Sequence, residues 1–268
     1  SERARTLPRT RAGLKIHPMI EPLLLTTTRV RTFDGTRALT EASGFFFAHD
    51  ERIFLVTSRH VVYEPAIGHR PDRIELNIHV DADDLTRVAT LSVLLYDGGL
   101  ANWRQARDSG GEVDVAAIEL DVATLPAGRQ MNCFTAEHLV HDLHEVSAGD
   151  AALIVGFPLG FHDTVHHLPV VRQAVVASSF GVRFQGLGYF LTDARTHRGS
   201  SGAPVVMHAP AMVTELPWKL LGVHSARMDM SSRDLRLDES LGLNCAWYAD
   251  ILLTLIADRD ADGPEPAR

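Results

Sequence analysis

Short apolar runs separated by polar turns recur along most of the chain, and their lengths are typical of β-strands. Between Arg73 and Val80 the alternation is strict, with an apolar residue at every second position, so one face of this strand is expected to be buried. Turn sequences such as Asp34-Gly35 and Asp97-Gly98-Gly99 stand between such runs. The predicted strands are 23–31, 43–48, 53–57, 73–80, 91–96 and 113–120 in a first series, and 151–156, 170–178, 182–185, 189–192, 203–207, 220–225 and 241–246 in a second.

Near the end of the chain the apolar period changes. Trp247, Ile251, Leu252, Leu255 and Ile256 follow helical spacing, which predicts a C-terminal helix over 247–257. Many short strands with a single late helix indicate an all-β barrel or sandwich. Two strand series joined by one connector indicate two barrels.

On this interpretation the chain divides into five segments. Residues 1–20 are rich in Arg and are expected to form an N-terminal arm without stable structure, and 258–268 form a polar tail. The first barrel is predicted over 21–124 and the connector over 125–149. The second barrel, with the C-terminal helix, is predicted over 150–257.

Composition narrows the function classes. The 268 residues, 45% apolar and 22% charged, are ordinary for a folded domain, and the net charge of −8 argues against nucleic-acid binding. No apolar run approaches the ~20 residues that span a bilayer, so no membrane attachment is expected. The basic N-terminus lacks the apolar segment of a signal peptide, so a cytoplasmic setting is expected; a secreted form whose signal has been removed stays open.

Cysteines and clustered histidines suggest no further chemistry. Cys133 and Cys245 are too few for a disulfide scaffold and are expected to be small core residues, although one bridge between them stays open. His138, His141 and His144 recur every three residues, a spacing that fits a solvated helix better than a metal site. No metal ligand is predicted.

The segment 196–204, Thr-His-Arg-Gly-Ser-Ser-Gly-Ala-Pro, has an unusual order of small residues before an apolar strand. Its glycines allow a tight turn that brings two backbone N–H groups to one point. Ser201 is then presented on a fixed loop beside amide donors. Acyl transfer needs this combination of a nucleophile and an oxyanion hole.

Two upstream residues could complete such a site. His60 ends the apolar strand 54–57, which would give its imidazole a rigid mount as a general base. Asp114 interrupts the apolar run 113–118, and burying its carboxylate is costly unless it is paired. An imidazole N–H is a suitable partner for that carboxylate.

At these residues the chain resembles the chymotrypsin-like, or trypsin-fold, serine peptidases. Residues 57–60, Thr-Ser-Arg-His, resemble their "TAAH" segment, residues 114–118 resemble "DIAL", and residues 199–204 resemble "GDSGGP". The order His, Asp, Ser matches as well, whereas α/β hydrolases run Ser, acid, His. Residues 153–160 resemble the "iGnPlG" strand of the bacterial HtrA-like and glutamyl-endopeptidase branches.

The resemblance implies two six-stranded antiparallel Greek-key β-barrels with the active site between them. It implies that Ser201 is the nucleophile, His60 the base and Asp114 the orienting acid, with the N–H groups of Gly199 and Ser201 as the oxyanion hole. The substrate would be a protein or peptide, and no cofactor is implied.

The sequence departs from the secreted family members at two points. Ser200 stands where digestive enzymes carry an Asp that pairs with a newly formed N-terminus, so activation through that ion pair is not expected. The disulfides of secreted animal members are missing, and no PDZ module is expected after the helix.

The residues expected to line the S1 pocket favour an acidic P1 side chain. Residues 221–225 resemble the "GIH" strand of glutamyl endopeptidases, in which a His and a Thr or Ser bind the substrate carboxylate. His224 and Thr196 hold the matching positions, and Arg195 could add positive charge. Ser225 would bind the P1 backbone. A structural His224 beside a pocket for small apolar residues is the alternative.

Two other hypotheses for the function of the whole chain stay open. The protein could be a catalytically latent or inactive binding module with the protease fold. It could also be the protease effector of a bacterial signalling or defence assembly, in which case a regulatory partner protein is expected.

Overall fold

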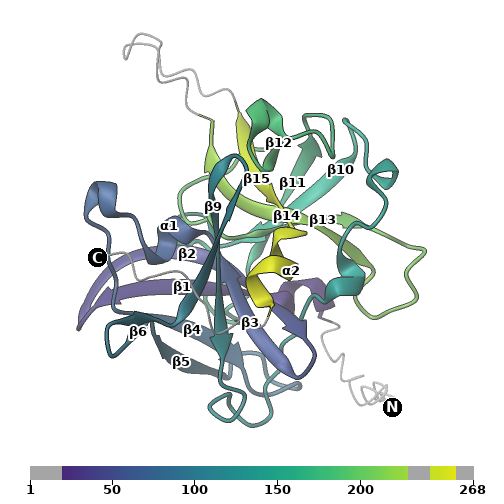
Figure 1. Cartoon of the computed structure of the whole chain (residues 1–268). Helices are drawn as coiled ribbons and strands as arrows, with labels where there is room; N and C mark the ends of the chain where they lie inside the picture. The colour runs from purple at the N-terminus through teal and green to yellow at the C-terminus, as the bar shows by residue number, and fades with distance from the viewer. Residues whose placement is uncertain (1–19, 229–241, 258–268) are drawn as a thin grey trace, which may run out of the picture.

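Antiparallel strands are the main regular structure of the computed structural model, which describes residues 20–228 and 242–257. The first half of the chain builds one sheet and the second half builds another, and the two lie against each other (Figure 1). Residues 1–19 of the predicted N-terminal arm, the polar tail and residue 241 of the last predicted strand lie outside the described residues.

The first half is a seven-stranded sheet in the order β5-β4-β1-β2-β3-β9-β8. Between β5 and β8 the chain forms a small hairpin, β6–β7. The segment that runs from β5 to β8 therefore pairs with β4 at its start and with β9 at its end, so it connects both edges of the sheet. The strands are β1 Thr27–Asp34, β2 Arg37–His49, β3 Arg52–Thr57, β4 Arg73–His79, β5 Val88–Leu94, β6 Tyr96–Asp97, β7 Leu100–Ala101, β8 Trp103–Asp108 and β9 Gly111–Leu120.

The second half is a closed six-stranded barrel in the order β10-β11-β12-β15-β14-β13. Every neighbouring pair in it is antiparallel, and β13 closes it by pairing with β10. The strands are β10 Ala151–Gly156, β11 Val170–Val176, β12 Tyr189–Asp193, β13 Pro204–His208, β14 Trp218–Arg227 and β15 Leu243–Tyr248.

Both halves use the same Greek-key connection. In the first half β4 returns to lie beside β1, and in the second half β13 returns to lie beside β10. The fourth strand beside the first is the defining order of a Greek key. The predicted all-β fold with two Greek-key units is confirmed.

Several details of the prediction are wrong. Residues 23–26 of the first predicted strand belong to a 3-10 turn, and the strand itself begins at Thr27. The first half has a further strand, β8, which was missed because Trp103–Asp108 is mostly polar. Residues 182–185 form no strand; Gln185 has a φ of 54° inside the turn Phe184–Gly186. The C-terminal helix α2 covers only Ile251–Ile256, because Trp247 belongs to β15.

Helical structure is short throughout the described residues. α1 covers Arg59–Val62, directly after β3. The 3-10 turns are η1 Pro22–Thr26, η2 Pro65–Ile67, η3 Ala136–His138, η4 Leu143–Glu145, η5 Pro158–Gly160 and η6 Phe184–Gly186. The expected helix in the connector is thus two separate turns, and His138 is buried, with its Nδ1 accepting the N–H of Thr135 at 2.9 Å, rather than solvated.

Each half has a core of its own, and a third core is shared between them. The central strands of the first half are apolar on both faces, which explains their unbroken apolar sequences. On β2, Phe46 faces the core of the first half, whereas Phe45 and Phe47 pack into the shared core. The shared core also contains Val206 and Trp247 from the second half.

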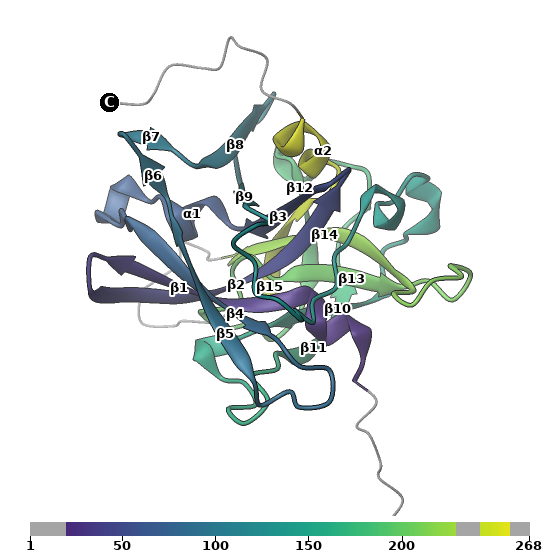
Figure 2. The same ribbon diagram turned by 90° about the horizontal axis from the view of Figure 1, so that it is seen from below.

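Helix α2 follows the second half in sequence but packs on the first (Figure 2). Arg52 donates to the carbonyl of Ile256 at 2.8 Å, and Arg104 donates to that of Ala257 at 2.7 Å. These charge-assisted bonds satisfy carbonyls at the helix end, where no intrahelical partner exists. The helix therefore ties the end of the chain across both halves.

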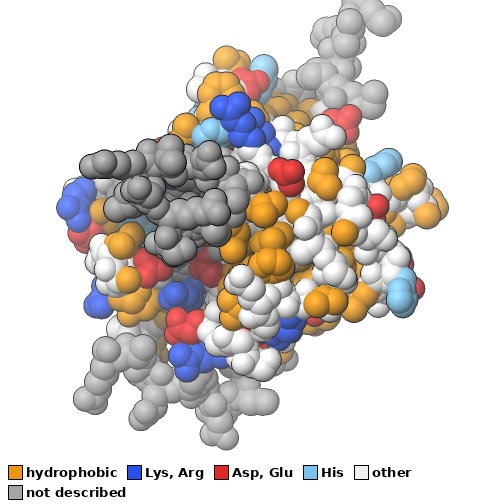
Figure 3. All heavy atoms as spheres, turned by 90° about the horizontal axis from the view of Figure 1, so that it is seen from above, with side chains coloured by type: hydrophobic (Ala, Val, Ile, Leu, Met, Phe, Trp, Pro, Cys, Tyr) orange, Lys and Arg blue, Asp and Glu red, His pale blue; other side chains and the backbone are white. Residues whose placement is uncertain are grey.

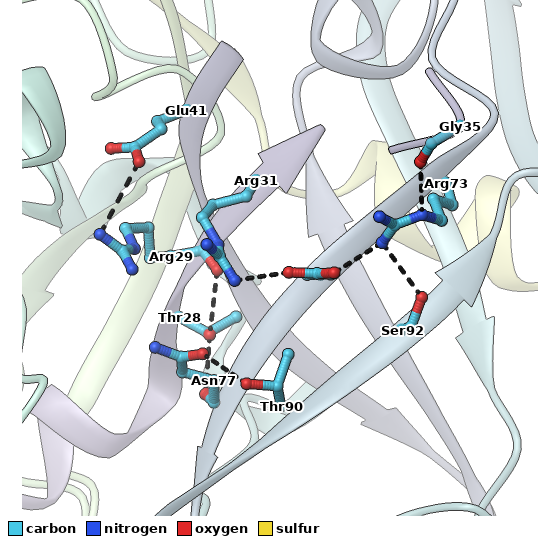
Figure 4. A network of polar contacts seen from close by, with 10 residues as sticks. Thr28, Arg29, Arg31, Gly35, Glu41, Arg73, Asn77, Thr90 and Ser92 are labelled. Atoms are coloured by element: carbon cyan, nitrogen blue, oxygen red, sulfur yellow. Dashed lines mark hydrogen bonds and ion pairs between the residues drawn. The ribbon is translucent and has the colours of Figure 1, made fainter. Parts of the chain in front are cut away.

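Polar side chains bridge neighbouring strands on the outside of the first half (Figure 4). Arg31 and Arg73 donate to the two carboxylate oxygens of Glu75 at 2.5 and 2.6 Å, and Arg73 also lies over the ring of Phe33. On the face shown in Figure 3, Lys and Arg side chains are scattered among acidic and apolar ones and form no continuous stripe.

Two further findings bear on the sequence expectations. Cys133 and Cys245 are both partly buried free thiols and are not bridged to each other. Within residues 20–228 and 242–257, no helix has the length and apolar character needed to cross a membrane.

Candidate active site

His60 and Asp114 lie together at one end of the first half. β3 delivers the chain to α1, whose second residue is His60, and Asp114 comes from β9, which pairs with β3. The ring Nδ1 of His60 lies 2.7 Å from Oδ2 of Asp114, and the backbone N–H of His60 donates to Oδ1 at 2.8 Å. Both carboxylate oxygens therefore hold the same residue, which fixes the ring orientation and the start of α1.

The electrostatics of this pair favour a charged carboxylate and a basic imidazole. Burial acts to lower the pKa of His60, but the hydrogen bond and charge of Asp114 outweigh it, so the pKa lies above its usual 6.5. Burial acts to raise the pKa of Asp114, and the hydrogen bond and charge of His60 reverse this, leaving the pKa below 3.8. Each group thus stabilises the charged form of the other.

Ser225, on β14, connects this pair to Ser201. Its hydroxyl donates to Oδ2 of Asp114 at 2.5 Å, and its carbonyl accepts the hydroxyl of Ser201 at 3.0 Å. Within the described part of the chain, no hydrogen bond joins Ser201 to His60. The structure therefore brings Ser201, Asp114 and His60 to one site with the Ser201 hydroxyl turned toward Ser225.

In the loop before Ser201, four successive carbonyls are held by the surrounding structure. The N–H of Leu159 donates to the carbonyl of Arg198 at 2.5 Å, and the hydroxyl of Ser43 donates to that of Gly199 at 2.8 Å. The N–H of Ala203 donates to the carbonyl of Ser200 at 3.0 Å, and the N–H of Ser43 donates to that of Ser201 at 3.0 Å.

The same loop contains amides that donate to no acceptor among the described residues, at His197 and Arg198 as well as at Gly199 and Ser201. Gly199 has a φ of +90° and packs so closely on the carbonyl of Phe157 that a Cβ would lie 2.5 Å from it. Only glycine fits that combination. The amides of Gly199 and Ser201 match the donors expected for an oxyanion hole.

Comparison with known families agrees with this geometry. The model of the trypsin-like peptidase domain matches residues 42–213, which is more than half of the chain and includes His60, Asp114 and Ser201. The chain belongs to the trypsin-like peptidase family.

Solved structures share the fold of this trypsin-like peptidase domain at low sequence identity. The HtrA-type protease AlgW with a tripeptide is 17% identical with a TM-score of 0.51, and the match covers 86% of this chain and 58% of AlgW. The serine endoprotease from Yersinia pestis is 15% identical with a TM-score of 0.50, covering 86% of this chain and 61% of that one. This chain spans less than two-thirds of either structure. No curated protein sequence matches it.

The residues predicted to line S1 in this trypsin-like peptidase are only partly available to a ligand. Thr196 is buried and donates its hydroxyl to Oδ1 of Asn244 at 2.5 Å. The side chain of Arg195 is exposed. His224 is buried and its Nδ1 has no hydrogen-bond partner; burial lowers its pKa to about 4, and the charge of His60 adds to this.

Two residues that shape this region were not identified from the sequence. Asn244 is buried on β15, and its amide donates to the carbonyls of Thr192 and Ala194 at 3.3 and 2.9 Å. Ser43 is buried on β2 beside the loop of Ser201. The sequence did contain a signal for Ser43, because this polar residue directly precedes an unbroken apolar run. Asp114 gave a similar signal as a polar residue inside an apolar run. Asn244 gave no comparable signal.

Proposed function

We propose that this protein is a serine endopeptidase that hydrolyses protein or peptide substrates. The observation that carries the proposal is the pairing of His60 with both oxygens of Asp114 beside a loop in which the amides of Gly199 and Ser201 are both unbonded. A nucleophile, an oriented base and preorganised amide donors are the parts that acyl transfer requires.

In the proposed reaction the Ser201 hydroxyl first turns from Ser225 to Nε2 of His60. Its Oγ attacks the scissile carbonyl carbon while its proton moves to Nε2, and the N–H groups of Gly199 and Ser201 stabilise the oxyanion. Asp114 stabilises the imidazolium that forms. His60 then donates the proton to the leaving amine as the peptide C–N bond breaks, which leaves an acyl-enzyme on Ser201.

Water completes the cycle by the same steps. His60 takes a proton from water, the resulting hydroxide attacks the acyl carbonyl, and the proton returns to Oγ of Ser201 as the ester bond breaks. The carboxylic acid product leaves and the hydroxyl is restored.

The first test is labelling by a fluorophosphonate probe, which reacts with an activated serine. We expect labelling of the wild-type protein and of Ser200→Ala, and none of Ser201→Ala. Ser200 is the matched control because it is adjacent, buried and of the same type. Wild-type protein that stays unlabelled, or label retained in Ser201→Ala, would refute the assignment.

We propose an acidic P1 preference as a finer property, supported mainly by His224. The Nδ1 of this buried ring has no hydrogen-bond partner, whereas the Thr196 hydroxyl already bonds to Asn244. Because the pKa of His224 is about 4, a bound carboxylate would have to accept an N–H from a neutral ring or raise that pKa. A P1-varied peptide panel tests this; preference for small apolar residues would overturn it.

A latent module with the protease fold is the second candidate function. The observation that favours it is the Ser201 hydroxyl bonded to Ser225 rather than to His60. A latent enzyme would resist the probe alone and become labelled when a regulatory partner protein is added. Labelling of the isolated wild-type chain would exclude this candidate.

A further inference from the structure

Ser43 is a fully buried polar residue, with 0% of its surface exposed, at the boundary between the two halves. Its hydroxyl donates to the carbonyl of Gly199 at 2.8 Å and accepts the N–H of Phe157 at 2.9 Å. Its backbone N–H donates to the carbonyl of Ser201 at 3.0 Å, and its carbonyl accepts the hydroxyl of Thr57 at 2.8 Å. Every polar atom of Ser43 is thus engaged, and three of the four bonds cross to the second half.

These bonds act on the peptide units next to the free amides. The N–H of Gly199 belongs to the peptide 198–199, and the N–H of Ser201 belongs to the peptide 200–201. The carbonyl that Ser43 holds through its hydroxyl belongs to the peptide between them, 199–200. Fixing this central peptide adds to the bonds that already hold the carbonyls of the flanking units, Arg198 by Leu159 and Ser200 by Ala203. It does so at a glycine, the residue whose backbone rotates most freely.

The surroundings leave no ready substitute for the hydroxyl of Ser43. Gly156 packs against it so closely that a Cβ there would lie 2.6 Å from Oγ. Gly202, with a φ of +83°, packs on the carbonyl of Ser43 and on Thr57. Removing the hydroxyl would therefore leave the Gly199 carbonyl and the Phe157 N–H buried without this partner.

We infer that Ser43 is a positioning residue that holds the oxyanion-hole amides in register from the opposite half of the molecule. The inference rests on the proposed function of Gly199 and Ser201. It assigns to β2 a role in the reaction that is separate from those of His60 and Asp114.

The test compares Ser43→Ala with Thr32→Val. Thr32 is an equally buried residue in the first half, and its hydroxyl bonds to Thr40, away from the Ser201 loop. Thr32→Val therefore removes a buried hydrogen bond, as Ser43→Ala does, without touching that loop. We expect the fluorophosphonate labelling rate of Ser43→Ala to fall by about 10- to 100-fold, somewhat less than the loss of an oxyanion donor itself. Thr32→Val should label at the wild-type rate.

Two measured quantities distinguish a positioning role of Ser43 from a simple loss of folded protein. The final labelled fraction of Ser43→Ala should equal that of the wild type, because unfolding would lower the labelled fraction whereas misplaced amides lower only the rate. The pH midpoint of labelling should also stay unchanged, because His60 sets it. If Ser43→Ala does not fold, Ser43→Cys keeps a weak donor and should label at an intermediate rate.

Hydrogen exchange provides a readout that does not depend on activity. Amide exchange in a peptide covering 196–203 should be faster in Ser43→Ala and unchanged in Thr32→Val. A Ser43→Ala rate equal to that of Thr32→Val overturns the inference while the proposed function stands. Wild-type protein that does not label refutes the proposed function, and unchanged exchange in Ser43→Ala then overturns this inference as well.

Discussion

His60 is bound to Asp114 through two different atoms, its backbone N–H and its ring Nδ1, at 2.8 and 2.7 Å. One carboxylate therefore positions both the main chain and the side chain of the same residue. Because α1 begins at Arg59, this double contact also fixes where the helix starts relative to β9. Loss of the carboxylate should therefore lower the rate of the reaction by more than the accompanying loss of folding stability can explain.

Replacing Asp114 by Asn should lower the labelling rate and peptide hydrolysis by on the order of 10⁴-fold, because the amide favours the wrong imidazole tautomer. The matched control is Asp163→Asn. Asp163 binds Nδ1 of His166 at the same 2.7 Å, but on an exposed loop, so its substitution should leave the rate unchanged. Equal rates in the two variants would contradict the role of Asp114.

The pH dependence of labelling follows from the shifted pKa of His60. The base must be neutral to accept the Ser201 proton, so the rate should rise with pH as His60 loses its proton. Since Asp114 holds that pKa above 6.5, the midpoint of the rising limb should lie above 6.5. Asp114→Asn should move it downward. A wild-type midpoint at or below 6.5 would show that the pair is not coupled in this way.

Adding a methyl group at Gly202 should be strongly destabilising. The position has a φ of +83°, and a Cβ there would collide with the Ser43 carbonyl and the Thr57 hydroxyl. We expect Gly202→Ala to lower the free energy of unfolding by about 3 kcal/mol or more, from strain and overpacking together. Gly35→Ala is the control, because its φ of +59° is also left-handed but nothing lies within 4 Å.

Urea unfolding of these two variants measures the difference directly. Gly35→Ala should cost only about 1–2 kcal/mol, the conformational part of the effect. Equal costs at the two positions would mean that the loop of Ser201 can move away from β2, which would also weaken the case for Ser43.

Asn244 should contribute more to stability than the neighbouring Thr196. Asn244→Ala removes the acceptor of the Thr196 hydroxyl and the donor to the Ala194 carbonyl, all within a buried site. A loss of about 2–4 kcal/mol is expected, against about 1–2 kcal/mol for Thr196→Val, which leaves the donor bonds of Asn244 in place. Urea unfolding checks this order, and a larger loss in Thr196→Val would contradict it.

The sequence was most informative where a polar or charged residue interrupts an apolar strand. Asp114 was identified because a carboxylate in an apolar strand needs a partner, and the structure places His60 there. Strand β8 was missed because hydrogen bonding to β9, rather than an apolar face, defines it. The contact of Ser43 with Gly199 joins residues 156 positions apart, and no local pattern encodes a pairing at that distance. For the same reason the sequence could not show that Thr196 bonds to Asn244.

The core shared by Phe45 and Phe47 with Val206 and Trp247 has a thermodynamic consequence. Separating the halves would expose apolar surface on both, so neither half is expected to persist alone once the other has melted. The chain should therefore unfold in a single calorimetric transition, in spite of its two Greek-key units. A single cooperative transition also means that damage at the Ser201 loop and damage on the distant face of the first half lower the same melting temperature.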